Sequence, residues 1–198
     1  WEKQIQDRGI KVLAVDDIDR KHSCDILVDT TLGKIDKNYK ELAPRATLFV
    51  GGRYPFFRPG FISLREKAFA RRQESTEVNN ILISLGGTDN LGLTSKVLDL
   101  LKTEKKFNYK VVLSEKSNSF ENVKEFCINN PNFELLSFVQ NMEELMSNSD
   151  LAIGAAGVSS YERAVLGLPT IMIQTADNQK DNIKAFKEEE IAKTISSD

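Results

Sequence analysis

Two turns rich in glycine and hydroxyl side chains carry the residue types that bind anions. One turn holds Gly86, Gly87 and Thr88, and the other covers residues 154–160. Glycine lacks a Cβ atom, so its backbone N–H can approach an anion closely, and a hydroxyl group adds a further donor. Such turns between a buried strand and a helix favour phosphate. The sequence therefore indicates a nucleotide or a sugar phosphate as the first ligand to consider.

Each of these turns also has a plainer structural interpretation. The first fits an ordinary strand-to-helix connection in which Asp89 or Asn90 caps the following helix. The second, which continues through Val158, Ser159 and Ser160, fits close packing of a helix against a strand. Two hydroxyl groups beside a glycine at a predicted helix start favour the anion-binding interpretation of the second turn. For the first turn both interpretations stay open.

Glu162 lies one helical turn after the second turn and has two interpretations. Its carboxylate suits the diol of a ribose, as acidic side chains do in nucleotide-binding folds. The spacing Ser159-x-x-Glu162 is equally that of a capping box, which closes a helix terminus. Farther along, Asn178 and Gln179 follow the last strong apolar run. Their carboxamides suit a sugar or phosphate oxygen, unless Asp177 or Asn178 caps the next helix.

The sequence lacks the common signatures of other nucleotide and metal chemistry. It has no G-x-G-x-x-G after a predicted strand and no G-x-x-x-x-G-K-[ST], so NAD binding and P-loop chemistry are disfavoured. The single histidine, His22, is interpreted as a structural loop residue. The strand-end carboxylates Asp16, Asp17 and Asp25 are interpreted as turn caps. No metal site and no cofactor are predicted.

Composition and charge limit the partners that are expected. Among 198 residues, 27 Lys and Arg oppose 29 Asp and Glu, and the charges form only short runs, so nucleic acid is not an expected partner. The two cysteines lie far apart and form no C-x-x-C, which is typical of a reducing, cytoplasmic setting. No apolar run approaches the ~20 residues that cross a bilayer, so no membrane span is expected.

Apolar runs alternate with segments of helical period from Asn80 onward. The predicted strands cover residues 81–85, 109–113, 133–138, 150–153 and 170–173, and the predicted helices cover residues 93–101, 120–128, 142–146, 160–166 and 182–187. This alternation predicts an α/β fold, in which helices cover both faces of a parallel sheet. Ligands of such sheets lie beyond the carboxyl ends of the strands, where the turns described above are expected to meet.

The first part of the chain has fewer elements. Three short strands are predicted, at residues 12–15, 26–28 and 48–50, and they bury too little apolar surface to fold confidently alone. They are interpreted as the back half of a domain whose front half precedes Trp1. A connector rich in glycine and proline follows, with an amphipathic segment after it. The predicted division is therefore residues 1–51, 52–79 and 80–198.

Several short motifs in combination resemble the UDP-sugar hydrolases of the pseudaminic acid pathway. The motifs lie along nearly the whole chain and are Val15–Asp17, His22–Asp25, Tyr54–Phe61, Ser84–Asp89, Asn141–Met142, Gly154–Gly157, Tyr161–Arg163, Gly167–Pro169 and Asp177–Gln179. These hydrolases are related to spore-coat polysaccharide biosynthesis proteins. They are also similar to the peptidoglycan N-acetylglucosaminyltransferase, which has a two-domain fold of the GT-B type. The resemblance implies two Rossmann-like parallel-sheet domains, of which the first is incomplete here.

The resemblance also assigns a role to each group of candidate residues. It makes residues 80–198 the nucleotide-binding domain and places Glu162 at the ribose. The other implied positions are Phe138, Val139 and Met142 at the uracil, Gly86, Gly87, Thr88, Gly157, Val158, Ser159 and Ser160 at the diphosphate, and Asn178 and Gln179 near the sugar and phosphates.

The implied reaction is hydrolysis of a UDP-linked diacetamido-trideoxyhexose. Water attacks the anomeric carbon and UDP departs, without a covalent enzyme nucleophile. The family carries its catalytic histidine in a G-x-G-H loop of the first βα unit, and no residue of this chain matches that loop. The catalytic residue is therefore unassigned, and the chain is expected to need an N-terminal segment of the same protein for activity. A UDP-dependent glycosyltransferase and a non-catalytic sugar-nucleotide-binding module are the alternatives.

Overall fold

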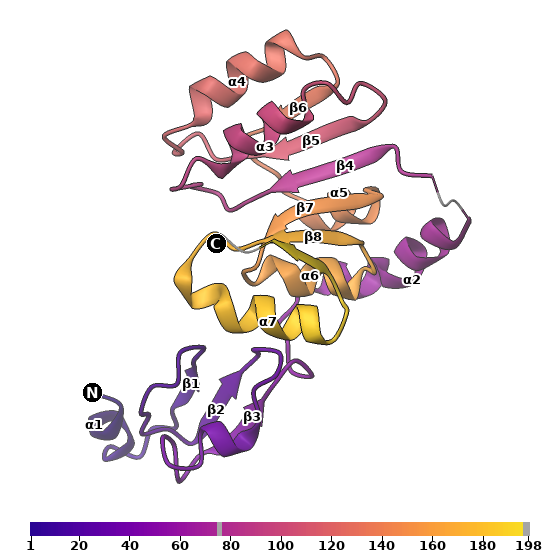
Figure 1. Ribbon diagram of the computed structural model, residues 1–198. Helices are drawn as coiled ribbons and strands as arrows, with labels where there is room; N and C mark the ends of the chain where they lie inside the picture. Colours follow the sequence, from indigo (N-terminus) through magenta and orange to yellow (C-terminus); the bar gives the residue numbers. More distant parts are fainter. Residues whose placement is uncertain (75–76, 196–198) are drawn as a thin grey trace. The chain divides into compact units, whose positions relative to one another are not determined.

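The chain forms two compact units, Trp1–Phe56 and Phe57–Asp198 (Figure 1). The computed structural model describes residues 1–74 and 77–195. The first unit contains a sheet of three strands and the second a sheet of six, and every strand pair is parallel. This confirms the predicted α/β class with two parallel sheets. The functional division at residues 52 and 80 stays a prediction.

The first unit is a small sheet with short helical segments. Its elements are α1 (Glu2–Gln6), β1 (Leu13–Val15), β2 (Ile26–Asp29), the 3₁₀ helix η1 (Asp36–Asn38) and β3 (Thr47–Val50). The strands pair in the order β1-β2-β3, and Leu27, Tyr39 and Val50 are buried between them and the covering segments. The edge strand β1 leaves Leu13 and Val15 58% and 55% exposed.

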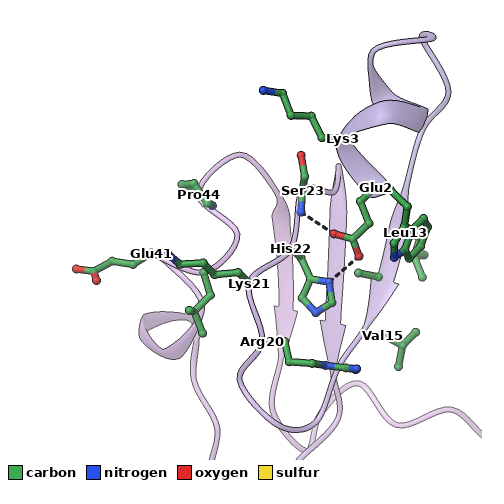
Figure 2. A pocket seen from close by; sticks show the side chains of 13 residues that line it. Glu2, Lys3, Leu13, Val15, Arg20, Lys21, His22, Ser23, Glu41 and Pro44 are labelled. Atoms are coloured by element: carbon green, nitrogen blue, oxygen red, sulfur yellow. Dashed lines mark hydrogen bonds and ion pairs between the residues drawn. The ribbon is translucent and has the colours of Figure 1, made fainter.

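Polar side chains hold the turns of the first unit (Figure 2). Glu2 Oε1 lies 2.8 Å from Nδ1 of His22, which ties α1 to the turn before β2. Asp16 accepts a hydrogen bond from the backbone N–H of Arg20 at 2.8 Å, and Asp25 accepts one from the backbone at the start of β1. The predicted turn-capping role of Asp16 is therefore confirmed, whereas Asp25 contacts residues 13 to 19 positions away and does not cap a turn. The role of Asp17 stays a prediction.

The second unit is a doubly covered parallel sheet. Its elements are α2 (Pro59–Glu74), β4 (Asn80–Ser84), α3 (Leu93–Leu101), β5 (Asn108–Val112), α4 (Phe120–Asn129), β6 (Phe133–Leu136), α5 (Met142–Ser147), β7 (Leu151–Ala155), α6 (Ser159–Val165), β8 (Thr170–Ile173), the 3₁₀ helix η2 (Asp177–Gln179), α7 (Lys180–Glu188) and β9 (Lys193–Ile195). The strand order is β6-β5-β4-β7-β8-β9, so β4 and β7 are central neighbours. Across residues 1–74 and 77–195, no helix has the length and apolar character to span a bilayer.

Alternate residues of β4 pack into two different cores. Ile81 and Ile83 face a cluster with Leu98 of α3 and Val123 of α4. Leu82 faces the opposite cluster, which α2, α5 and α6 and their flanking residues supply. A strand that is apolar on both sides must be covered on both faces, which explains the continuous apolar run in the sequence. The two layers hold the carboxyl ends of the central strands in fixed register.

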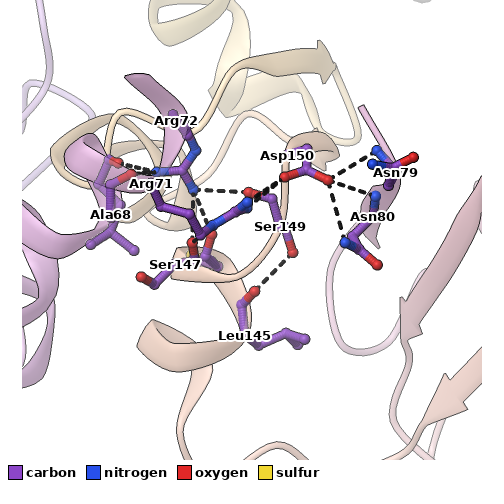
Figure 3. A network of polar contacts seen from close by, with 11 residues as sticks. Ala68, Arg71, Arg72, Asn79, Asn80, Leu145, Ser147, Ser149 and Asp150 are labelled. Atoms are coloured by element: carbon purple, nitrogen blue, oxygen red, sulfur yellow. Dashed lines mark hydrogen bonds and ion pairs between the residues drawn. The ribbon is translucent and has the colours of Figure 1, made fainter. Parts of the chain in front are cut away.

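Within the second unit, polar contacts hold helix α2 against the neighbouring elements (Figure 3). Arg72 donates hydrogen bonds to four carbonyl oxygens at 2.6–3.0 Å, those of Ala68, Met146, Ser149 and Leu166. Arg71 pairs with Asp150 at 2.6 Å, and the other oxygen of Asp150 accepts the backbone N–H of Asn80 at 2.7 Å. These contacts join α2 to the amino ends of β4 and β7. The helix extends two residues beyond each end of the predicted amphipathic segment, residues 61–72.

Two strand predictions differ from the structure. The strand predicted at residues 133–138 ends at Leu136, because its partner β5 ends at Val112, the residue that pairs with Leu136. Phe138 therefore lies in the following loop and is 82% exposed. Strand β9 was not predicted, since its three residues carry no clear apolar alternation, and it forms by pairing with β8 at the sheet edge.

Candidate functional site

The two glycine-rich turns follow neighbouring central strands. Ser84, the last residue of β4, pairs with Gly154 in β7, so the turns after both strands leave the same edge of the sheet. The chain proceeds from β4 outward to β5 and β6, then returns to β7 and proceeds outward on the other side. This reversal is a topological switch point, where open parallel sheets leave a crevice for ligands. The structure thus brings the turns at residues 86–88 and 157–159 together.

The first turn presents backbone donors to solvent. The amides of Gly86, Gly87 and Thr88 have no hydrogen-bond partner among residues 1–74 and 77–195, and all three residues are exposed. Gly86 has φ +103°, a conformation that favours glycine. Asp89 accepts the backbone N–H groups of Leu93 and of the next residue, both at 2.9 Å. The predicted cap at Asp89 is confirmed, and it leaves the preceding amides available.

The second turn has the same property over Gly157, Val158 and Ser159. None of these three amides has a partner within the described part of the chain. Ser160 differs, because its amide and its hydroxyl both donate to the carbonyl of Gly157, at 2.9 and 2.6 Å. Ser160 is also 2% exposed and accepts a hydrogen bond from Asn182 at 3.0 Å. Ser160 therefore stabilises the turn from within, and the available donors come from the three residues before it.

Helix α6 is too short to contribute a strong dipole. It covers seven residues and begins at Ser159, with Val158 in the capping position and no side-chain cap. The capping box considered for Ser159 and Glu162 is therefore absent. A helix of two turns adds little aligned dipole, so the individual amides are the donors that this turn offers to an anion.

Glu162 lies half-buried on α6 in a charged neighbourhood. Burial raises its pKa, while Arg58, Arg163 and a hydrogen bond from Ser159 partly oppose the shift. Arg58 also pairs with Glu143 at 2.9 Å. The carboxylate is thus partly desolvated and flanked by cations, an environment that strengthens hydrogen bonds to it.

Asn178 and Gln179 lie in η2, after the neighbouring strand β8. Gln179 Oε1 accepts the backbone N–H of Thr175 at 2.9 Å, and its Nε2 donates to the hydroxyl of Thr175 at 3.0 Å. A Cβ atom placed on Gly157 would lie 3.8 Å from Gln179 Nε2. Gln179 therefore borders the second turn, whereas Asn178 is exposed. The residue in the capping position of η2 is Ala176, with no side-chain cap, so the capping alternative for Asp177 and Asn178 is wrong.

The predicted uracil turn leaves the same sheet edge but follows the outer strand β6. Phe138 is exposed, Val139 is partly buried, and Met142 packs against the apolar cluster beneath α2 and α5. Arg58 Nη1 donates to the carbonyl of Gln140 at 3.3 Å, which fixes this loop to the start of α2. The sequence did not reveal this contact, because Arg58 is 82 residues away from Gln140.

Arg163 is a functional candidate that the sequence did not distinguish. It is 1% exposed, and its Nη2 donates to the carbonyl of Ala155 at 2.6 Å. Its guanidinium lies against Gly154, where a Cβ atom would come within 2.6 Å of Cζ. Gly154 was grouped with the phosphate turn in the sequence, but it lies inside β7 and makes room for this side chain.

His22 and its neighbours belong to the first unit. His22 Nε2 is buried without a hydrogen-bond partner among the described residues and lies 3.6 Å from Asp16 Oδ1. Burial raises the pKa of Asp16, but hydrogen bonds from Arg20 and Tyr39 outweigh it and lower the value to about 2. No group of three or more His, Cys, Asp or Glu within residues 1–74 and 77–195 has an arrangement that could hold a metal ion.

Comparison with known proteins gives the family of the second unit. Residues 80–197 match the glycosyltransferase family 28 C-terminal domain. The spore coat polysaccharide biosynthesis protein SpsG of Bacillus subtilis is 28% identical over 145 residues, which cover 72% of this chain and 42% of that protein. A UDP-N-acetylglucosamine–N-acetylmuramyl-(pentapeptide) pyrophosphoryl-undecaprenol N-acetylglucosamine transferase of Leuconostoc mesenteroides is 28% identical over 119 residues, which cover 57% and 33%. The chain thus spans about a third to two fifths of the length of the curated relatives it matches.

The solved structures agree at the level of the fold. The crystal structure of Acinetobacter baumannii MurG superimposes with a TM-score of 0.64 and 18% identity, covering 98% of this chain and 56% of that one. This likeness confirms the expected relation to GT-B glycosyltransferase folds with parallel α/β sheets. The chain therefore belongs to the family of the glycosyltransferase family 28 C-terminal domain.

Proposed function

We propose that the second unit binds the UDP part of a UDP-sugar at the carboxyl ends of β4 and β7. The observation that carries the proposal is a set of six amides on two adjacent strand ends, at residues 86–88 and 157–159, which have no partner in the part of the chain that the structure describes. Family membership supports it, because curated relatives include transferases whose names specify a UDP-sugar donor. The ligand class follows from the donors and the family together.

The diphosphate is the part of the ligand that these amides suit. Backbone N–H groups in concave turns bind anions, and a hydrogen bond to a charged group contributes about 1.5–3 kcal/mol. The hydroxyl of Thr88 adds one donor at the first turn, whereas the hydroxyl of Ser159 donates to Glu162. Because the amides belong to fixed turns, they need no reorganisation when negative charge develops on the departing diphosphate. The site is therefore suited to stabilise UDP both as a ligand and as a leaving group.

Glu162 is proposed to accept hydrogen bonds from the ribose diol. Its half-buried carboxylate lies on the helix that follows the second turn, between Arg58 and Arg163. The loop carrying Phe138 and Val139, held by Arg58, is proposed to contact the base. Gln179 borders Gly157 and, with exposed Asn178, is proposed to lie near the sugar and phosphates.

Sugar transfer is favoured over hydrolysis as the reaction of the intact protein. In either reaction the bond between the anomeric carbon and the diphosphate oxygen breaks, and UDP leaves with the bonding electrons. The acceptor is a hydroxyl group in a transferase and water in a hydrolase. The matching family is one of glycosyltransferases, whereas the hydrolase of the pseudaminic acid pathway is supported only by the motif resemblance. The general base is not assigned to any residue of this chain.

The binding site is tested by isothermal titration calorimetry, which measures the affinity of the 198-residue chain for UDP, uridine and pyrophosphate. We expect Glu162→Ala to weaken UDP and uridine by the same factor and to leave pyrophosphate binding unchanged, because the carboxylate contacts only the ribose. Glu121→Ala is the matched control, since Glu121 is exposed on α4 at the opposite face. Absence of UDP binding by the folded wild-type chain would refute the proposal.

Transfer and hydrolysis are separated by product analysis of the intact protein that contains this chain. A UDP-sugar is incubated with and without an acceptor hydroxyl, and free UDP and free sugar are measured. A transferase releases UDP mainly when the acceptor is present and leaves little free sugar. Equal amounts of UDP and free sugar without acceptor would establish the hydrolase instead.

A further inference from the structure

We infer that Arg163 is a positioning residue for the proposed diphosphate site. Its buried guanidinium holds the carboxyl end of β7 so that the amides of residues 157–159 are presented to the ligand. The inference rests on the proposed function, because it concerns the same site. It adds a residue that neither the anion-binding turns nor the predicted ribose and base contacts include.

The first support is the contact that Arg163 makes with the strand. Nη2 donates to the carbonyl of Ala155 at 2.6 Å. Ala155 is the last residue of β7 and lies two residues before Gly157. Arg163 itself is the fifth residue of α6, so the contact closes the turn between strand and helix from its buried side. Movement of the guanidinium therefore changes the direction in which the chain leaves the strand.

The second support is the fit between Arg163 and Gly154. A Cβ atom on Gly154 would lie 2.6 Å from both Cζ and Nη1 of the guanidinium, which is closer than real Cβ atoms come. The backbone of Gly154 has no φ in the left-handed region, so its conformation alone does not require glycine. Glycine at this position is explained by the space that the guanidinium occupies.

The third support is a hydrogen-bond deficit larger than that of Arg72, in which Nε alone is buried without a partner among the described residues. Nε and Nη1 of Arg163 are buried without a partner among residues 1–74 and 77–195. Burial lowers the pKa of Arg163 to about 10, and Glu162 partly opposes the shift, so the group carries its charge at neutral pH. A buried, incompletely paired cation costs free energy. The hydrogen bond that Nη2 does make, to Ala155, lies at the end of the strand that leads into the proposed site.

Arg72 is a partly buried arginine whose contacts lie away from the proposed site, and it is the natural comparison. Its two terminal nitrogens reach four carbonyl oxygens within 3.0 Å, near the amino end of β7. Arg163 makes one such contact, at the carboxyl end of the same strand. Many carbonyl partners at the far end of the strand are typical of a packing role. A single partner at the end that leads into the proposed site fits a positioning role.

The test compares UDP with uridine, which lacks the phosphates, in variants of the 198-residue chain. Arg163→Met removes the charge and keeps much of the volume, Arg163→Lys keeps the charge, and Gly154→Ala keeps the charge but displaces the guanidinium. Arg72→Met is the control for the loss of a partly buried arginine that donates to backbone carbonyls. Affinities are measured by calorimetry, and the free energy of unfolding is measured by urea denaturation of each variant. The decisive quantity is the ratio of UDP affinity to uridine affinity.

We expect Arg163→Met and Gly154→Ala each to reduce this ratio at least tenfold, about 1.4 kcal/mol. Arg163→Lys should recover part of the loss, and the double variant of Arg163→Met with Gly154→Ala should lose no more than either alone, because both changes remove one contact. Arg72→Met should lower stability and leave the ratio unchanged. If Arg163→Met fails to fold, Gly154→Ala and Arg163→Lys carry the same test.

Three results overturn the inference in distinguishable ways. If the wild-type chain binds UDP more tightly than uridine and the Arg163 and Gly154 variants keep the wild-type ratio, Arg163 is only a packing residue and the proposed UDP site stands. If the folded wild-type chain binds neither ligand, the proposed site and the inference fall together. A uniform loss of both affinities in the Arg163 variants also contradicts the inference, since it indicates general destabilisation.

Discussion

Gly87→Ala is expected to weaken UDP binding without weakening the fold. A Cβ atom at this position has only the Cβ of Ser114 nearby, 4.0 Å away, and the backbone φ is not left-handed. The methyl group is therefore accommodated, and the free energy of unfolding should stay within about 0.5 kcal/mol of the wild type. The same methyl group occupies open space beside the unpaired amides. We expect roughly tenfold weaker UDP binding, about the contribution of one hydrogen bond to a charged group.

Gly86→Ala is the matched variant in the same turn. A Cβ atom there meets nothing within 4 Å, but φ is +103°, so an L residue is strained even though there is space for it. The strain is worth about 1–3 kcal/mol, which should appear as a loss of stability. The pair of variants thus separates conformational strain, at Gly86, from obstruction of the ligand, at Gly87.

Urea denaturation gives the free energy of unfolding of the two variants, and calorimetry gives their UDP affinities. The reasoning predicts that Gly86→Ala is the less stable of the two and that Gly87→Ala binds UDP about tenfold more weakly than the wild type. A Gly87→Ala variant that binds UDP as tightly as the wild type would show that these amides do not face the ligand. Equal loss of stability in both variants would show that the turn is under strain throughout.

Three further predictions concern the fold and the loop after β6. Arg72→Met should lower the free energy of unfolding by about 1–3 kcal/mol in urea denaturation, because it removes the hydrogen bonds that the guanidinium donates to the carbonyls of Leu166 and Met146; a change below about 0.5 kcal/mol contradicts this. Asp16 has a pKa lowered to about 2, so the stability it contributes is present above pH ~4 and lost as pH falls toward 2. Asp16→Asn should flatten that part of the pH–stability curve by at most about 2 kcal/mol, and an unchanged curve refutes the assignment. Arg58→Ala should weaken uridine and UDP equally and leave pyrophosphate unchanged, since it releases the loop at Gln140; selective loss of pyrophosphate would contradict it.

Much of the fold could be predicted because apolar runs in a doubly covered parallel sheet are distinctive. Residues 81–85 predict a strand that is buried on both faces, and the structure has β4 at Asn80–Ser84. The periodicity of the sequence does not predict a strand correctly where pairing with a neighbouring strand, rather than the pattern of side chains, sets its bounds. Strand β9 exists only because β8 offers a free edge, and β6 stops at Leu136 where its partner stops. These are tertiary effects that a local pattern does not contain.

The site could be predicted only as a set of turns. Glycine and hydroxyl residues after apolar runs mark residues 86–88 and 157–159, but the strand order that makes β4 and β7 neighbours comes from the structure. The contact of Arg58 with the loop after β6 spans 82 positions, and no local spacing indicates it. Arg163 was also missed, because an arginine on a short helix is usually exposed, and only burial against Gly154 distinguishes it.

The most direct test is to follow the backbone amide signals of Gly86, Gly87 and Gly157 by NMR while the chain is titrated with UDP, and separately with uridine. UDP should shift all three signals with one common dissociation constant, because a single diphosphate binds between the ends of β4 and β7. Uridine should leave these signals nearly unchanged while it shifts residues near Glu162. If UDP binds and the three glycine signals do not move, or if they move with different dissociation constants, the proposed site is wrong.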